Sequence, residues 1–189
     1  MATRISRDHL SQFFENGLNL ETRTIYFGYG QEQSDIELDH VLAARVMKSL
    51  HLLNNVPRRE EPITLLINNQ GGDDSHGLGI YDMIQAMDCE VNGYVWGNCQ
   101  SMAVWVLQAC DKRFMSKYST MMIHHGEGSK DYWTKHQDEV CAKILLDKIQ
   151  EKNPTFSRAK LEKMLDVDTF LNAQQALHLG LIDEVIGNA

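Results

Sequence analysis

A hydroxyl, an imidazole and a carboxylate occur along this chain at positions where predicted elements begin or end. Ser101 lies at a predicted strand-to-helix junction, His124 follows a β-rich run, and Asp168 belongs to a local acidic cluster. A serine hydroxyl becomes a nucleophile when an imidazole takes its proton and a carboxylate orients that imidazole. Such triads are known in several chain orders, so the order Ser101, His124, Asp168 is compatible with nucleophilic catalysis.

Two consecutive glycines, Gly71 and Gly72, follow an apolar strand at 63–67 that is predicted to be buried on both faces. Because glycine has no side chain, a backbone N–H at this point can approach a ligand closely, which suits an oxyanion hole or a phosphate cradle. The sequence contains neither the dinucleotide fingerprint G-x-G-x-x-G nor a P-loop with its lysine. Nucleotide binding therefore finds no support.

Each of these residues also has a purely structural interpretation. Gly71-Gly72 can form a tight turn, Ser101 can cap a helix, and Asp168 can be a solvated loop residue. His124 and His125 are neighbours, and adjacent residues on an extended strand point to opposite faces, so we expect at most one of them to face a given site. No other residues have the spacing of metal ligands, so the sequence predicts neither a metal ion nor a cofactor.

The elements that must position these residues alternate along the chain. Short apolar runs are followed by longer amphipathic runs, which is the pattern of an α/β domain. In such folds, sites form where the carboxyl ends of strands meet the N-termini of helices. Asn172 and Gly180 are suited to cap the last helix. We expect strands at 24–28, 63–67, 91–96, 120–123 and 181–185, and helices at 36–53, 78–87, 101–109, 131–152, 158–165 and 173–178.

Composition narrows the class of protein. The 189 residues, 43% of them apolar, suit one compact domain. A formal net charge of −8 argues against a general phosphate-binding surface, so we predict no nucleic-acid partner. No run of roughly 18 apolar residues exists and no apolar segment follows the first residues, so we expect neither a membrane span nor a secretory signal. The four cysteines are widely spaced, which favours reduced thiols and a cytoplasmic protein.

The motifs resemble those of one known family, the proteolytic subunit of the Clp protease (ClpP), from about Tyr26 to Val185. Segments 66–72 (LINNQGG) and 79–85 (GIYDMIQ) are similar to the family's Y-I-N-S-P-G-G and A-I-Y-D-T-I-Q. Segments 100–103 (QSMA) and 122–124 (MIH) are similar to A-S-M-G and M-I-H. Segments 168–173 (DTFLNA) and 180–183 (GLID) are similar to D-x-F-[LM]-[ST]-A and G-L-I-D.

This resemblance implies a ClpP/crotonase-like α/β fold of stacked βαβ units with a protruding helical handle. It implies a serine endopeptidase in which Ser101 is the nucleophile, His124 is the general base and then the acid, and Asp168 orients the imidazole. The backbone N–H groups of Gly72 and Met102 would form the oxyanion hole. The substrate would be an unfolded polypeptide or a peptide.

The resemblance also implies an assembly. One or two heptameric rings would enclose the active sites of a homo-oligomer, and a hexameric AAA+ unfoldase would feed it. We divide the chain into an N-terminal segment at 1–23, predicted as a helix, and a single peptidase domain at 24–189. A handle at about 126–153 within that domain would join two rings.

The chain departs from the family pattern at several places. Asn69-Gln70 replaces Ser-Pro before the double glycine, Ala103 replaces a glycine, and His125-Gly126 replaces Gln-Pro. The segment between His124 and the long helix is shorter than the family's handle strand. The family's axial loop, which gates the pore, has no clear counterpart at 1–7.

These departures keep alternatives open. A crotonase-like acyl-CoA enzyme would share the fold and its glycine-backed oxyanion hole, and it would need no serine nucleophile. A catalytically silent ring subunit or scaffold would tolerate the altered residues around the site. A Clp-like processing protease of viral type, with a narrow substrate, would share the chemistry and differ in its partners.

Overall fold

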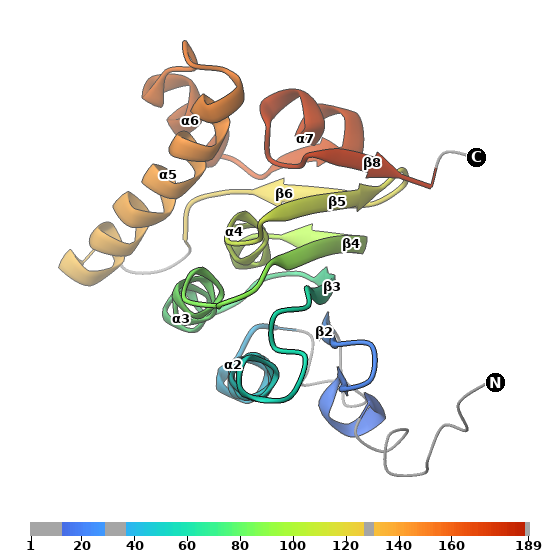
Figure 1. Cartoon of the computed structure of the whole chain (residues 1–189). Helices are drawn as coiled ribbons and strands as arrows, with labels where there is room; N and C mark the ends of the chain where they lie inside the picture. Colours follow the sequence, from blue (N-terminus) through green and yellow to red (C-terminus); the bar gives the residue numbers. More distant parts are fainter. Residues whose placement is uncertain (1–12, 29–36, 127–130, 188–189) are drawn as a thin grey trace.

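The computed structural model describes residues 13–28, 37–126 and 131–187 (Figure 1). In these ranges the chain forms one mixed α/β unit around an eight-stranded sheet. Its strands are β1 (Leu18–Asn19), β2 (Thr24–Gly28), β3 (Ile63–Asn69), β4 (Val91–Gln100), β5 (Lys112–Ser116), β6 (Thr120–Ile123), β7 (Thr169–Asn172) and β8 (Glu184–Ile186). Its helices are α2 (His40–Asn55), α3 (Asp74–Gln85), α4 (Met102–Gln108), α5 (Tyr132–Lys152), α6 (Arg158–Leu165) and α7 (Ala173–Leu179).

The central strand β4 divides the sheet into two branches. The main path runs β1-β2-β3-β4-β5-β8, in which all pairs are parallel except the antiparallel pair of β1 and β2. The first half of β4, at Asn92–Val95, pairs with β5, and its last residues, Asn98–Gln100, pair in parallel with β6. β7 then pairs antiparallel with β6. The branch of β6 and β7 therefore lies beside the carboxyl end of β4, where a parallel sheet places its site.

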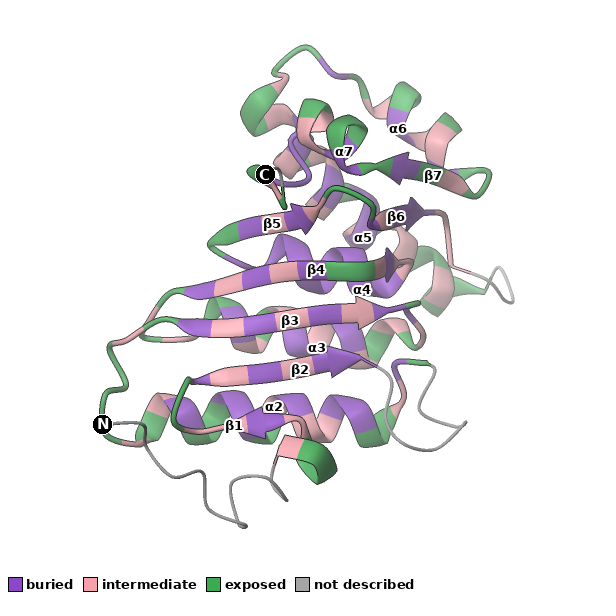
Figure 2. Ribbon diagram, turned by 90° about the vertical axis from the view of Figure 1, so that its right-hand side faces the viewer, coloured by how far each residue is buried: buried purple, intermediate pink, exposed green. Residues whose placement is uncertain are grey.

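Helices cover one face of the main sheet. Figure 2 shows α2, α3 and α4 behind β2, β3 and β4, while the opposite face of these strands carries no helix among the described residues. Along β3 the burial alternates, with Leu65 and Ile67 buried and Leu66 half-buried. The expectation that this strand is buried on both faces is therefore wrong for the single chain, because only one face meets helices.

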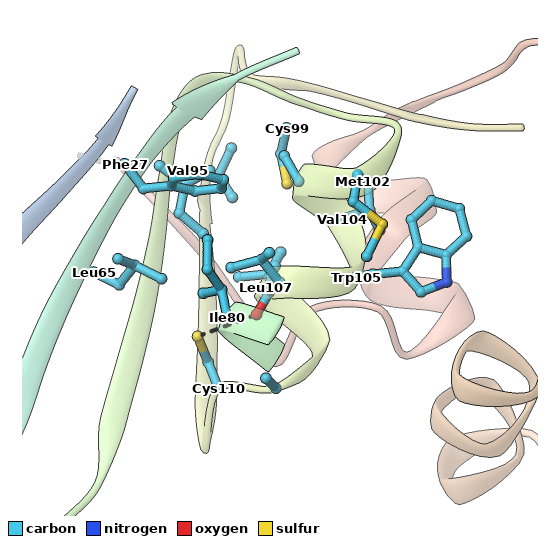
Figure 3. Close-up of a cluster of buried hydrophobic side chains, with 14 of the residues drawn as sticks. Phe27, Leu65, Ile80, Val95, Cys99, Met102, Val104, Trp105, Leu107 and Cys110 are labelled. Atoms are coloured by element: carbon cyan, nitrogen blue, oxygen red, sulfur yellow. Dashed lines mark hydrogen bonds between the residues drawn. The ribbon is translucent and has the colours of Figure 1, made fainter. Parts of the chain in front are cut away.

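Helix α4 forms the centre of the hydrophobic core. Every residue of α4 is buried, and the indole N–H of Trp105 donates a hydrogen bond of 2.8 Å to the backbone carbonyl of Cys141 in α5. Figure 3 shows the surrounding cluster, with Leu65 and Val95 from the sheet, Ile80 from α3 and Leu107 from α4. This packing fixes the start of α4, and with it Ser101, against the sheet.

Most predicted elements are present, with shifted boundaries. Helix α3 begins at Asp74 rather than at 78, because the Asp73 side chain caps it by accepting a hydrogen bond from the backbone N–H of His76. β4 continues through Gly97, whose φ is +101°, and ends at Gln100 rather than at 96. The last strand is β8 at 184–186 rather than 181–185.

Three strands, β1, β5 and β7, were not predicted from the sequence. All three are short and partly exposed, and β5 begins with Lys112 and Arg113. Helices α6 and α7 and strand β6 lie where the sequence predicts them, and Asn172 and Gly180 cap α7 as expected. No described helix is long and apolar enough to cross a membrane.

Part of the predicted domain plan falls outside the described residues. This applies to 1–12, including the comparison with the axial loop at 1–7, and to 127–130 within the handle at 126–153. In the described part of the N-terminal segment, residues 13–16 form a helical turn and β1 pairs with β2. The division at residue 23 and the handle remain predictions.

Candidate active site

Ser101 occupies a tight turn between β4 and α4. Its φ of +46° and ψ of −133° place a non-glycine residue in a conformation that side chains rarely adopt. Such backbone strain is typical of a nucleophile held at a strand-to-helix turn. The backbone N–H of Ser101 donates a hydrogen bond of 2.8 Å to the carbonyl of Met122, so the turn is held against the end of β6.

Gly71 lies directly against this turn. A Cβ atom at Gly71 would lie 2.6 Å from the Ser101 Cβ and 2.8 Å from the Met102 nitrogen, which is closer than real contacts allow. The φ of Gly71 is +91°, so its conformation also favours glycine. The first of the two glycines is therefore needed for the loop after β3 to touch the Ser101 turn.

The Ser101 side chain does not cap the helix. It makes no hydrogen bond to the first turn of α4, and its Oγ lies 2.8 Å from the Nε2 atom of His124. The structural interpretation of this serine as a helix cap is therefore wrong.

His124 links Ser101 to Asp168. The Nδ1 atom of His124 lies 3.1 Å from the Oδ1 atom of Asp168. β6 places His124 beside the end of β4, and the antiparallel pairing of Ile123 with Thr169 places Asp168 next to His124. The His124 side chain is 16% exposed and that of Asp168 is 62% exposed. The structure thus brings the three predicted residues into one hydrogen-bonded line whose carboxylate end faces solvent.

His125 points away from this line, as the alternation of a strand predicts. Its Nε2 atom lies 3.0 Å from a carboxylate oxygen of Glu162 in α6. Its backbone N–H donates to the carbonyl of Leu165 at 2.8 Å. His125 therefore ties the end of β6 to α6.

Two backbone N–H groups remain available near Ser101. The carbonyl of Gly71 accepts a hydrogen bond from Leu38, and the N–H of Asp73 donates to the carbonyl of Leu38. Among the described residues, neither the N–H of Gly72 between them nor the N–H of Met102 has a hydrogen-bond partner. Unpaired N–H groups at the start of a helix can bind an oxyanion.

These groups border a cleft of about 530 Å³. Ser101, His124 and the two glycines line one part of it, and Trp133 of α5 lines another. Asp74, which the sequence analysis did not single out, also lines the cleft. Burial raises the pKa of Asp74, and the negative charges of Asp138 and Asp73 raise it further, while His124 acts in the opposite direction. No group of three or more His, Cys, Asp or Glu side chains in the described ranges is arranged to hold a metal ion.

Comparison with known proteins identifies the family. A family model described as Clp protease matches residues 25–189. The chain is 32% identical over 167 residues to an ATP-dependent Clp protease proteolytic subunit 2 of Chlamydia trachomatis, covering 85% of this chain and 79% of that protein. It is 31% identical to the protein of the same name from Chlamydia muridarum, with the same coverage of 85% and 79%. The chain therefore belongs to the Clp protease family.

Solved structures agree with this assignment. ClpP1 from Listeria monocytogenes superposes with a TM-score of 0.76 at 27% identity, covering 90% of this chain and 94% of that one. A point mutant of the same Listeria protein gives a TM-score of 0.78 at 27% identity, covering 95% and 96%. The predicted ClpP-type α/β fold is confirmed, and membership of this family supports a proteolytic role.

Proposed function

We propose that this protein is a serine endopeptidase in which Ser101 is the nucleophile, His124 the general base and acid, and Asp168 the carboxylate that orients the imidazole. The observation that carries the proposal is the continuous contact from Ser101 Oγ through His124 to Asp168, at 2.8 Å and 3.1 Å. The strained turn at Ser101 and the missing helix cap support it further. A serine that only stabilised the helix would use its side chain at the helix start.

The chemistry follows from these contacts. His124 Nε2 accepts the hydroxyl proton as Ser101 Oγ attacks a peptide carbonyl, since a neutral serine is a poor nucleophile. The N–H groups of Gly72 and Met102 stabilise the negative charge that develops on the carbonyl oxygen. His124 then donates the proton to the leaving amine. In the second half of the reaction, His124 takes a proton from water as the water oxygen attacks the acyl-enzyme. The ester bond to Ser101 Oγ then breaks, His124 returns the proton to Oγ, and the new carboxyl product leaves.

The proposal predicts that Ser101→Ala abolishes both peptide hydrolysis and labelling by a fluorophosphonate, because both require the same Oγ atom. Ser157→Ala is a matched control, because Ser157 does cap a helix, accepting a hydrogen bond from the backbone N–H of Lys160. Labelling is measured by intact-protein mass. Undiminished hydrolysis by the Ser101→Ala variant would contradict the assignment of the nucleophile.

The same experiment separates the alternative classes. A crotonase-like acyl-CoA enzyme requires no line of serine, histidine and carboxylate, and a catalytically silent subunit would not react with the fluorophosphonate. A processing protease with a narrow substrate would be labelled in the same way and would differ in the peptides it cleaves.

We further propose that the chain assembles into homo-oligomeric rings that enclose the active sites and receive polypeptide from an AAA+ unfoldase. The helix-free face of the sheet supports assembly, because Tyr94 stacks on Phe114 there and Trp96 is 50% exposed. Apolar side chains on such a face favour a protein partner. Native mass spectrometry distinguishes a monomer, one ring and two rings, and a stable monomer would contradict this part of the proposal.

A further inference from the structure

The cleft beside Ser101 is lined by acidic side chains. Glu37, Asp73 and Asp74 border it, and it is lined by no lysine or arginine in the part of the chain that the structure describes. An adjoining narrow pocket shares Asp74 and Ser101 with the cleft and adds Asp138. A substrate that enters this cleft therefore meets a negative potential next to the proposed nucleophile.

Asp74 lies in the first turn of α3 and differs from the neighbouring carboxylates in its hydrogen bonding. Asp73 caps α3, and Asp138 accepts a hydrogen bond of 3.1 Å from the backbone N–H of Gly126. The Asp74 carboxylate has no hydrogen-bond donor and no ion-pair partner among the described residues. A half-buried carboxylate without a partner is unfavourable, and a cation would relieve the cost.

The position of Asp74 relates it to one residue of the substrate. It lies two residues after Gly72, whose N–H we assign to the oxyanion hole. The carbonyl carbon and the side chain of the attacked residue share one Cα, so a carbonyl oxygen bound at Gly72 brings that side chain into the cleft that Asp74 also borders. Asp74 borders both the cleft and the narrow pocket at this point.

The carboxylates of Asp74 and Asp138 approach each other beside Gly126. A Cβ atom at Gly126 would lie 3.0 Å from a carboxylate oxygen of Asp74 and 3.3 Å from one of Asp138. The two negative charges therefore lie close together beside Gly126. Any larger residue at 126 would crowd both carboxylates.

An aromatic side chain also lines the cleft. Trp133 borders the cleft from the first turn of α5 and is 60% exposed. The Nε2 group of Gln137 donates a hydrogen bond of 2.9 Å to Ser75 Oγ, which ties α5 to α3 next to Asp74. An indole face packs well against the apolar stem of a long basic side chain and attracts its charge.

We propose that Asp74 makes this active site selective for lysine or arginine at the residue whose carbonyl is attacked. The inference rests on the proposed peptidase function and adds a substrate class to it. The cation would lie in the cleft against the Asp74 carboxylate, where Asp138 adds to the negative potential, with its stem toward Trp133.

The test compares fluorogenic peptides that differ only at this residue, which is lysine, arginine, leucine or glutamate. A charge-assisted contact raises kcat/KM for the lysine and arginine peptides about tenfold to 100-fold over the leucine peptide, and the glutamate peptide is the poorest substrate. Asp74→Asn removes this preference. Asp147→Asn is the matched control, because it makes the same change in net charge on the exposed side of α5, where Asp147 pairs with Lys143.

Fluorophosphonate labelling separates this inference from the proposed function, because the probe reacts with the serine whatever side chain the pocket prefers. A labelled enzyme that cleaves the leucine peptide as well as the basic ones overturns the selectivity and leaves the peptidase function standing. Preference retained in Asp74→Asn overturns the role of Asp74. Absence of both labelling and cleavage overturns the two proposals together. The comparison of peptides on the unmodified protein does not depend on how any variant folds.

Discussion

Replacement of Asp168 by asparagine tests how much an exposed carboxylate contributes to this site. Coulomb's law gives the attraction between an imidazolium and a carboxylate 3.1 Å apart as about 1.3 kcal/mol in bulk water and about 5 kcal/mol at an effective dielectric constant of about 20. These limits correspond to about tenfold and about 10⁴-fold in rate. Because the Asp168 side chain is 62% exposed and that of His124 only 16%, we expect Asp168→Asn to lower kcat/KM by roughly 100-fold.

The assay is hydrolysis of a fluorogenic peptide at increasing salt. Screening shortens the Debye length from about 10 Å at 0.1 M to about 3 Å at 1 M, so the ratio of wild-type to variant activity shrinks as salt is added. Asp166→Asn is the matched control, because this carboxylate lies 3.9 Å from His125 and not in the line to Ser101. Unchanged activity in Asp168→Asn would refute a role for the carboxylate. A loss of about 10⁴-fold that salt does not alter would refute the reasoning from exposure.

Two further predictions concern the backbone and the pH dependence of stability. Gly71→Ala places a methyl group 2.6 Å from the Ser101 Cβ at a φ of +91°, so we expect at least a tenfold loss of peptidase activity. The control Gly79→Ala should retain activity, because the nearest atom to the added methyl group is 4.0 Å away. Equal activities in the two variants would contradict the argument. Burial alone would raise the pKa of Asp183. The hydrogen bonds and charge of Arg113 together outweigh this effect, so the pKa lies below its ordinary value of 3.8. A lowered pKa contributes stability that is present above the ordinary value and lost as pH falls through the folded-state value. The free energy of unfolding in urea should therefore fall below about pH 4, with a smaller slope in Asp183→Asn, and equal slopes would contradict the linkage.

Helices with a regular apolar spacing were the easiest part of the fold to predict. The buried residues of α2, such as Leu42, Val46 and Leu50, recur every three or four positions, so the sequence shows directly which face meets the sheet. Strands β2, β3 and β6 were predicted because they are apolar and end at glycine or at polar residues. The sequence could not show that one face of β3 lies open in the single chain, because that depends on where the helices pack.

β5 could not be predicted because its buried face carries a charge. Arg113 is buried, and its guanidinium donates to both carboxylate oxygens of Asp183 and to the side-chain oxygen of Gln108. From the sequence alone, such an arginine is predicted to be exposed to solvent. Its carboxylate partner lies far along the chain, so only the folded structure reveals that its charge is compensated.

Asp74 was missed for a similar reason. Its position after Gly71-Gly72 was visible, but an aspartate in a turn-rich segment is ordinarily a solvated residue. The role that we propose for Asp74 depends on its burial beside Asp138, which lies in a different helix. The one indication in the sequence was that Asp74 lies two residues after Gly72.

By itself, the sequence determined which groups are present and in what order: an alternating α/β pattern, a double glycine after a strand, and a serine, a histidine and an aspartate near the ends of elements. It left open whether Ser101 caps a helix or faces an imidazole. Only the tertiary structure decided this, because β6 pairs with both β4 and β7 and so joins Ser101, His124 and Asp168 across separations of 23 and 44 residues. Proton transfer requires contact within about 3 Å, and contact between distant residues is set by strand pairing and core packing, which local sequence does not encode.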